Sequence, residues 1–177
     1  MPYRRIVLVF AFLSLVVSLV TPGVLAQDPP PADATPGTQG ITVAVLSGLD
    51  PSNAGGQGLE MREFTWAPGA YVTPHTHPAA FIICTQSGAL GFSIQSGAAV
   101  VTRSTGIGTP TAAEPMAVGD EVVLAPRDCV AVDQSESGTI HTAWNASEEP
   151  TITIETYLFD RDLPGRTFVN AQGTPIP

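Results

Sequence analysis

The sequence predicts an all-β fold of the barrel or sandwich type, and three observations lead to this prediction. The 177 residues include 17 Gly and 17 Pro, a density that breaks helices but suits short strands joined by turns. The apolar residues occur in short runs rich in Val, Ile, Thr and aromatic side chains. No window shows the 3.6-residue apolar period of an amphipathic helix. The length suits one domain with its own core.

Nine runs after residue 40 are the expected strands, and none is longer than nine residues. Evenly spaced short strands of this kind are typical of a sandwich or barrel. The runs are 41–46, 59–66, 80–86, 89–95, 98–103, 121–125, 129–133, 139–145 and 151–159. Residues 104–120 are expected to form a long loop, and residues 161–177 an irregular C-terminal tail.

Residues 1–26 have the layout of a secretory signal peptide. Arg4 and Arg5 precede an apolar run over residues 6–20, and the sequence VLA offers a cleavage site after Ala26. The alternative is an uncleaved membrane anchor, although the run is shorter than the ~20 residues that a membrane span needs. We therefore expect a secreted or extracytoplasmic protein that meets a membrane only through this segment.

The residues after the cleavage site separate this segment from the folded part. Residues 27–40, QDPPPADATPGTQG, are polar and Pro-rich, so they are expected to be a disordered linker before a domain over residues 41–160. Cleavage leaves five Arg against 16 acidic residues, a net charge of −11. Without a basic stripe, the folded part is a poor partner for nucleic acid or for an anionic membrane surface.

Cys84 and Cys129 are the two cysteines of the chain. An oxidising compartment permits a disulfide between them, closing a 45-residue step in the sequence. Two buried free thiols are an alternative, and a thiolate metal ligand is a third.

The three histidines of the chain form a candidate metal site. His75 and His77 are two residues apart, so in an extended segment their side chains leave the same face, roughly 6.5–7 Å apart at the Cα atoms. Two imidazoles placed in this way can bind one metal ion at about 2.0–2.1 Å each. A third imidazole can come only from His141 on another strand.

Two segments resemble the conserved motifs of the cupin superfamily. Residues 69–90 are similar to the first motif, G-x5-H-x-H-x3-E-x6-G, and residues 119–145 to the second, G-x5-P-x-G-x2-H-x3-N. The matching residues are Gly69, His75, His77, Gly88, Gly119, Pro126, Gly138, His141 and Asn145. The resemblance implies a single-domain jelly-roll β-barrel that holds a metal ion inside, and a possible homodimer. In this reading Asn145 serves the end of its strand.

The match to these motifs departs from the pattern in three places. Gly119 and Pro126 are one residue further apart than the corresponding residues of the motif. Eleven residues separate Pro126 from Gly138, where the motif has one. The glutamate of the first motif, normally an anionic metal ligand, is replaced by Phe81. The expected site therefore has three neutral imidazoles and an apolar ring beside them.

Such a site is expected to hold one divalent transition metal. Iron and zinc fit best, copper and nickel are possible, and manganese prefers more oxygen ligands. Zinc on three histidines can lower the pKa of a bound water to about 7. Iron(II) would keep open positions for dioxygen and substrate.

The candidate substrate-binding residues are Arg62, Phe81, Gln86 and Tyr157, and Arg62 could bind a substrate carboxylate. Trp66 is expected in the core, and Glu155 is a possible replacement for the missing carboxylate. Three hypotheses follow: a metal-dependent enzyme of oxygenase, lyase or isomerase type acting on a small organic metabolite, a non-catalytic barrel that binds a small ligand or metal, and a structural or interaction barrel. Fold-level similarity alone does not give the reaction.

Overall fold

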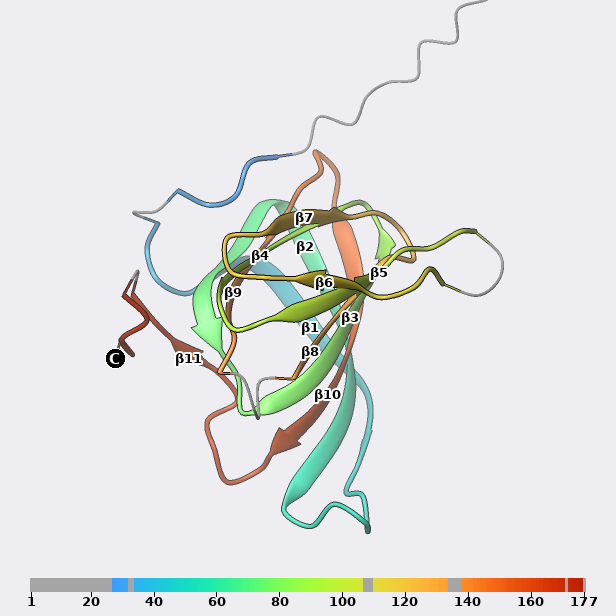
Figure 1. The fold of residues 1–177 in the computed structure, drawn as a ribbon, viewed down its shortest axis with the longest axis vertical. Coiled ribbons are helices and arrows are strands. Elements are labelled where there is room, and N and C mark those ends of the chain that lie inside the picture. Colours follow the sequence, from blue (N-terminus) through green and yellow to red (C-terminus); the bar gives the residue numbers. More distant parts are fainter. Residues whose placement is uncertain (1–26, 32–33, 107–109, 134–137, 171, 177) are drawn as a thin grey trace, which may run out of the picture.

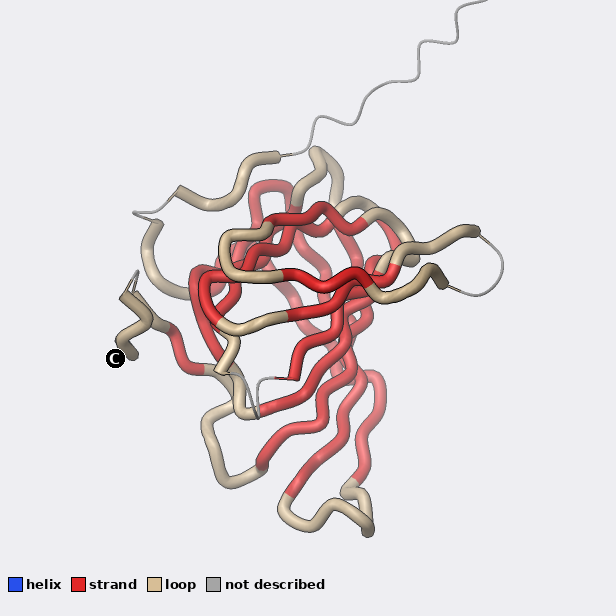
Figure 2. The backbone as a smooth tube through the Cα atoms, in the orientation of Figure 1, coloured by secondary structure: helices blue, strands red, loops and turns tan. Residues whose placement is uncertain are grey.

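The computed structural model describes residues 27–31, 34–106, 110–133, 138–170 and 172–176. Every regular element in these residues is a β-strand (Figure 2), and the predicted all-β fold class is confirmed. The predicted signal peptide lies outside the described residues. Among the segments that are described, none forms a helix with the length and apolar character that a membrane crossing needs.

Eleven strands form one antiparallel sheet that curls into a half-barrel (Figure 1). The main path through the sheet is β6-β5-β8-β3-β10-β2-β9-β4-β7, and β1 and β11 both pair with β2. The strands are β1 (Thr38–Leu49), β2 (Gln57–Thr76), β3 (Ala79–Ser87), β4 (Leu90–Ser96), β5 (Ala99–Thr102), β6 (Glu114–Met116), β7 (Glu121–Leu124), β8 (Cys129–Asp133), β9 (Ile140–Asn145), β10 (Thr151–Asp160) and β11 (Thr167–Phe168). The inner face is apolar over most of its area and forms the core.

Strand β2 holds much of this sheet together, because it pairs with four other strands. The part before Gly69 pairs with β10, the part after it pairs with β9 and β11, and β1 pairs with both parts, from Leu59 to Val72. Gly69 itself has a φ of +73°, a left-handed conformation that glycine adopts without strain. Asn145 Nδ2 at the end of β9 lies 3.0 Å from the carbonyl oxygens of both Trp66 and Ala67 just before this corner.

The observed strands extend beyond several of the predicted runs. The predicted run covers 59–66, but β2 continues through Pro68 and Pro74 to Thr76. Pro74 is tolerated because the ladder with β9 has an irregularity between Val72 and His75, where no regular pairing is needed. The long loop over 104–120 contains the short strand β6, and the tail contains β11. The eleven residues before Gly138 contain β8, which pairs with β3 and β5.

Gln27, in the segment before β1, forms hydrogen bonds with the sheet. The backbone N–H of Gln27 donates to the Ala146 carbonyl at 2.9 Å, and its side-chain oxygen accepts from the N–H of Gly69 at 3.1 Å. Trp144 Nε1 donates to the Gln27 carbonyl at 2.9 Å. Because Trp144 is buried, its indole N–H needs an acceptor, and the N-terminal segment supplies one.

Gly88 in the first motif allows two strands to approach closely. Its φ is +74°, and a Cβ atom there would lie 2.3 Å from the Thr151 side-chain oxygen. Thr151 Oγ1 in turn accepts from the Ala89 N–H and donates to the Ala89 carbonyl. The motif glycine therefore lets the β3–β4 turn pack against the start of β10.

Cys84 and Cys129 form a disulfide, which is one of the three alternatives left open by the sequence. They are direct partners in the β3–β8 ladder, with Cα atoms 4.1 Å apart. Direct cross-strand neighbours are close enough for such a bond. The disulfide therefore fixes β8 to the middle of the sheet.

We predict that replacing both cysteines, Cys84→Ala with Cys129→Ala, lowers the free energy of unfolding by about 3–4 kcal/mol, because the 45-residue loop is then open in the unfolded chain. Chemical denaturation of the oxidised wild type and the double variant measures this difference. Dithiothreitol should destabilise the wild type and leave the variant unchanged. Equal unfolding midpoints for the oxidised wild type and the variant would contradict the prediction.

Candidate metal centre

Adjacent strands bring the three histidines together on the inner face of the sheet. His75 lies near the end of β2 and is the direct cross-strand partner of His141 on β9. His77 follows the last residue of β2. All three are buried, with 2%, 6% and 2% of their surface exposed for His75, His77 and His141. The interior histidine group that the sequence predicted is therefore present.

The ring nitrogens of this group are arranged to bind one ion. One ligand nitrogen from each histidine can be chosen so that all three lie within 4.8 Å of one another. His75 Nδ1 is 2.8 Å from the Thr73 carbonyl, and His77 Nδ1 is 2.6 Å from the Gly165 carbonyl. A carbonyl accepts, so these Nδ1 atoms carry the protons, and Nε2 is the ring nitrogen of each that can act as a metal ligand. The donor set fits a divalent metal ion.

Burial keeps these imidazoles neutral. It lowers the pKa of His75 and of His141 well below the usual 6.5, and the pKa of His77 to about 4. The positive charge of Arg166 lowers all three pKa values further, and the neighbouring histidines also lower those of His75 and His141. Because a metal binds the unprotonated ring, the site is ready for a cation at neutral pH.

Phe81 occupies the space beside the histidines where the motif has glutamate. It is buried on β3, with its ring centroid 5.4 Å from that of His77 and 5.3 Å from that of His141. Phe92 also stacks on His141, with the ring centroids 4.9 Å apart. In the described part of the chain, the group that could hold a metal consists of three histidines without a carboxylate.

Glu155 does not take the place of the missing ligand. It is fully buried on β10, where it accepts hydrogen bonds from Thr153 and from the hydroxyl of Tyr157. Trp66 Nε1 donates to Thr153 and extends this buried chain. Desolvation raises the pKa of Glu155 to about 7 and that of Tyr157 well above 10. Tyr157 therefore keeps its proton, and its ring lies 5.8 Å from that of His77.

A cavity of about 440 Å³ opens beside His77 at the mouth of the half-barrel. Two of the predicted substrate-binding residues, Arg62 and Tyr157, line it. The Arg62 guanidinium lies 5.2 Å from the centre of the Tyr157 ring and forms an ion pair with Glu60 at 2.6 Å. The charge of Arg62 is therefore already balanced within the protein. The lining residues are Thr38, Arg62, His77, Ala79, Tyr157, Phe159, Leu163, Gly165, Arg166 and Phe168.

The C-terminal tail contributes residues to this site that the sequence reasoning missed. Gly165 supplies the acceptor for His77, Arg166 lines the cavity, and Phe168 on β11 is the direct partner of His75. Figure 1 shows β11 and the C-terminal residues beside the open end of the sheet. The available signal was Arg166 itself, one of only five arginines after residue 26.

Gln86 does not belong to the site. The inward side chains of β3 are Phe81, Ile83 and Thr85, so strand alternation turns Gln86 to the outside, where it is exposed. The sequence prediction placed Gln86 on the correct strand. It did not consider that Phe81 and Gln86 are an odd number of positions apart, so their side chains point to opposite faces of the sheet.

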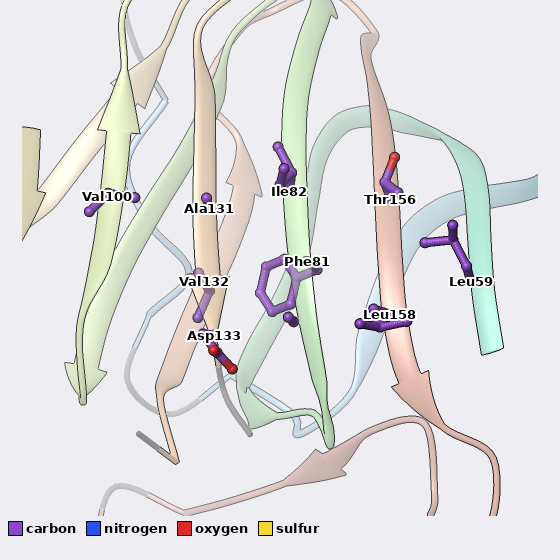
Figure 3. Close-up of a pocket in the computed structure, with 10 residues that line it drawn as sticks. Leu59, Phe81, Ile82, Val100, Ala131, Val132, Asp133, Thr156 and Leu158 are labelled. Atoms are coloured by element: carbon purple, nitrogen blue, oxygen red, sulfur yellow. The ribbon is translucent and has the colours of Figure 1, made fainter. Parts of the chain in front are cut away.

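A second cavity, of about 410 Å³, lies on the outer face of the sheet and has a different character. Figure 3 shows Val100, Ala131, Ile82 and Thr156 in a row across β5, β8, β3 and β10. Asp133 is its one charged residue, and no histidine lines it. It has no set of donors for a metal ion.

No family model and no curated protein matches this sequence. Solved structures do align with it. KdgF from Halomonas sp. is 19% identical, with a TM-score of 0.46 over 77% of this chain and 91% of that chain. The cupin 2 domain of an XRE family transcriptional regulator from Enterobacter cloacae is 18% identical, with a TM-score of 0.43 over 70% and 100%. A cupin 2 domain-containing protein from Halorhodospira halophila is 17% identical, with a TM-score of 0.40 over 77% and 76%.

Identities below 20% and TM-scores below 0.5 say nothing about the activity of this chain. The class of protein follows from its own geometry. The two motifs lie on the strands that surround the histidines, and the antiparallel sheet curls around them. The chain has a cupin-type fold with a three-histidine group that fits a metal site.

We predict that the metal-free protein loses stability as the pH falls from 6.5 to about 4. Unfolded histidines take up protons near pH 6.5, whereas His77 in the folded state stays neutral down to about 4. The unfolded state therefore binds more protons in this window, and acid favours it. Glu155 acts in the opposite sense between 4.5 and about 7, because its folded pKa is raised.

The comparison of wild type with His77→Gln isolates the contribution of this histidine. Removing one titrating group should make the decline in unfolding free energy less steep by up to about 1.4 kcal/mol per pH unit. Urea unfolding of the metal-free proteins at closely spaced pH values gives both slopes. Parallel curves would show that His77 titrates equally in the folded and unfolded states.

Proposed function

We propose that this chain is an exported metal-binding protein that uses one divalent transition metal to bind and transform a small organic metabolite. The observation that carries the proposal is the set of three buried, neutral imidazoles whose ligand nitrogens lie within 4.8 Å of one another. Three imidazoles without a carboxylate suit iron or zinc better than manganese. An oxygenase, a lyase or an isomerase is the form that catalysis would take.

The residues His75, His77 and His141 would hold the ion, which when bound supplies a Lewis acid beside the cavity. The chain contributes the rest. Thr73 and Gly165 orient the imidazoles through their carbonyl groups, and the apolar rings of Phe81 and Phe92 keep water from the inner side. Tyr157 lines the cavity and donates a hydrogen bond from its hydroxyl to the buried Glu155 behind it, whose pKa of about 7 suits a group that gains and loses a proton near neutral pH.

A non-catalytic metal or ligand binder is the second candidate, and Phe81 favours it. A buried phenylalanine in place of a carboxylate removes the anionic ligand and narrows the space around the ion. Such a protein would bind the metal in a fixed ratio but show no turnover.

Export and self-association belong to the same proposal. The disulfide supports an oxidising compartment, because such bonds persist outside the cytoplasm. For a homodimer, the exposed apolar row on the outer face, in which Ile82 and Val100 are 48% and 39% exposed, provides a surface. Both the location and the dimer remain predictions.

Elemental analysis tests the metal site. The mature chain from Gln27, purified without an affinity tag, should contain about one equivalent of iron or zinc. The His75→Ala/His141→Ala variant should contain none, because one histidine cannot hold the ion alone. Gln86→Ala is the matched control, since its side chain faces outward and should leave the metal content unchanged.

The identity of the ion then directs the search for activity: iron indicates oxygen-dependent chemistry, and zinc indicates Lewis-acid chemistry of the lyase or isomerase type. Circular dichroism and the presence of the disulfide establish that the histidine variant is folded. A wild-type protein without bound metal, even after reconstitution, would overturn the proposal.

A further inference from the structure

We propose that Arg166 forms an anion site in the cavity beside His77, and that the natural ligand is a carboxylate attached to a small apolar body. This inference deepens the proposed function by naming its ligand class, but it depends on residues that do not bind the metal.

The first step of the argument is charge. Of the five arginines after residue 26, Arg62, Arg103 and Arg161 form ion pairs with acidic residues, at 2.6, 2.9 and 2.8 Å respectively. Arg127 is exposed and donates to the Gly106 carbonyl. Arg166 is half-buried, and no ion pair to it occurs among the described residues.

The second step is hydrogen bonding. Arg166 Nη1 donates to the Thr38 hydroxyl at 2.7 Å, but Nε is shielded from solvent and has no hydrogen-bond partner in the described part of the chain. A buried donor left without an acceptor is costly. Burial also lowers the pKa of Arg166, whereas the charge of Glu155 raises it. The oxygens of Glu155 are engaged by Thr153 and Tyr157, so this carboxylate does not serve as the acceptor.

The third step is the shape of the binding site. A guanidinium binds a carboxylate through its N–H donors, so a carboxylate in the cavity that Arg166 lines would supply the missing charge. The other walls of the 440 Å³ cavity are largely apolar and include Ala79, Phe159, Leu163 and Phe168. The carboxylate therefore belongs to a molecule with an apolar part, and the cavity places that molecule against His77.

A purely structural role for Arg166 makes a different prediction. In that case the side chain would only donate a hydrogen bond to Thr38 and pack over Phe168, whose ring centre is 5.7 Å from the guanidinium carbon. Replacing Arg166 would then lower stability without changing the response to anions.

Benzoate is the probe, with benzamide as its uncharged counterpart and acetate as a carboxylate without the apolar body. Isothermal titration of the metal-free, full-length mature protein should detect benzoate, weaker acetate binding and no benzamide binding. Arg166→Gln should weaken benzoate binding by about tenfold or more. Arg166→Lys should restore part of it, because the charge returns without the planar pair of donors.

Arg161→Gln is the matched control, because Arg161 is exposed and pairs with Asp50 away from the cavity. It should bind benzoate like the wild type. Benzoate binding that is absent in the wild type, equal in Arg166→Gln, or matched by benzamide would overturn the inference. Metal content measured on each protein as purified, before the metal is removed for titration, separates the two proposals: anion binding by a protein that never held metal rejects only the proposed function, and metal without anion binding rejects only the Arg166 site.

Discussion

The register between β2 and β9 is the constraint on which the metal centre depends. It places His75 directly opposite His141, and the two-residue period of an extended segment then brings His77 to the same face. A slip of one residue would turn His141 outward and dismantle the group. Asn145 fixes this register four residues later, where its amide lies within hydrogen-bonding distance of the carbonyl groups of Trp66 and Ala67 before the corner of β2. The spacing H-x3-N therefore has a structural explanation, since the histidine belongs to the candidate metal site and the asparagine aligns the strand.

The interior of the half-barrel is unusual in the charges that it holds. Three imidazoles are kept neutral by burial, and Glu155 has a pKa near neutrality, so the inner wall carries little fixed negative charge. The acidic residues that give the chain its negative charge are mostly on the outside. Arg166 is then a half-buried cation at the cavity mouth of an acidic protein. Such an arrangement directs anions to one place on the molecule.

The sequence predicted the parts of this site that depend on short-range patterns. Strand alternation and motif spacing identify the three histidines, and composition identifies the all-β class. The other parts depend on contacts between distant segments. Gly165 and Arg166 reach the site because β11 pairs with the end of β2, and a two-residue strand leaves no periodic signal. Gln27 is held by an indole 117 residues away. The disulfide could be predicted only in part. With two cysteines in the chain the possible pair was evident, but the sequence did not show that they lie opposite each other on neighbouring strands.

The loss of the motif glutamate and the unpaired Arg166 are two aspects of one charge balance. A divalent ion on three neutral imidazoles keeps its full charge, and burial among aromatic rings makes that charge costly. Arg166 adds a further positive charge at the same cavity. In a site with Glu at position 81, the protein itself would supply part of the compensation. Phe81 has no negative charge to offer, and Glu155 accepts hydrogen bonds from Thr153 and Tyr157 instead. The compensating negative charge would therefore have to come from a bound anion. An incoming carboxylate would relieve both positive charges at once, so phenylalanine at position 81 would weaken metal binding in the empty site and would favour anionic ligands.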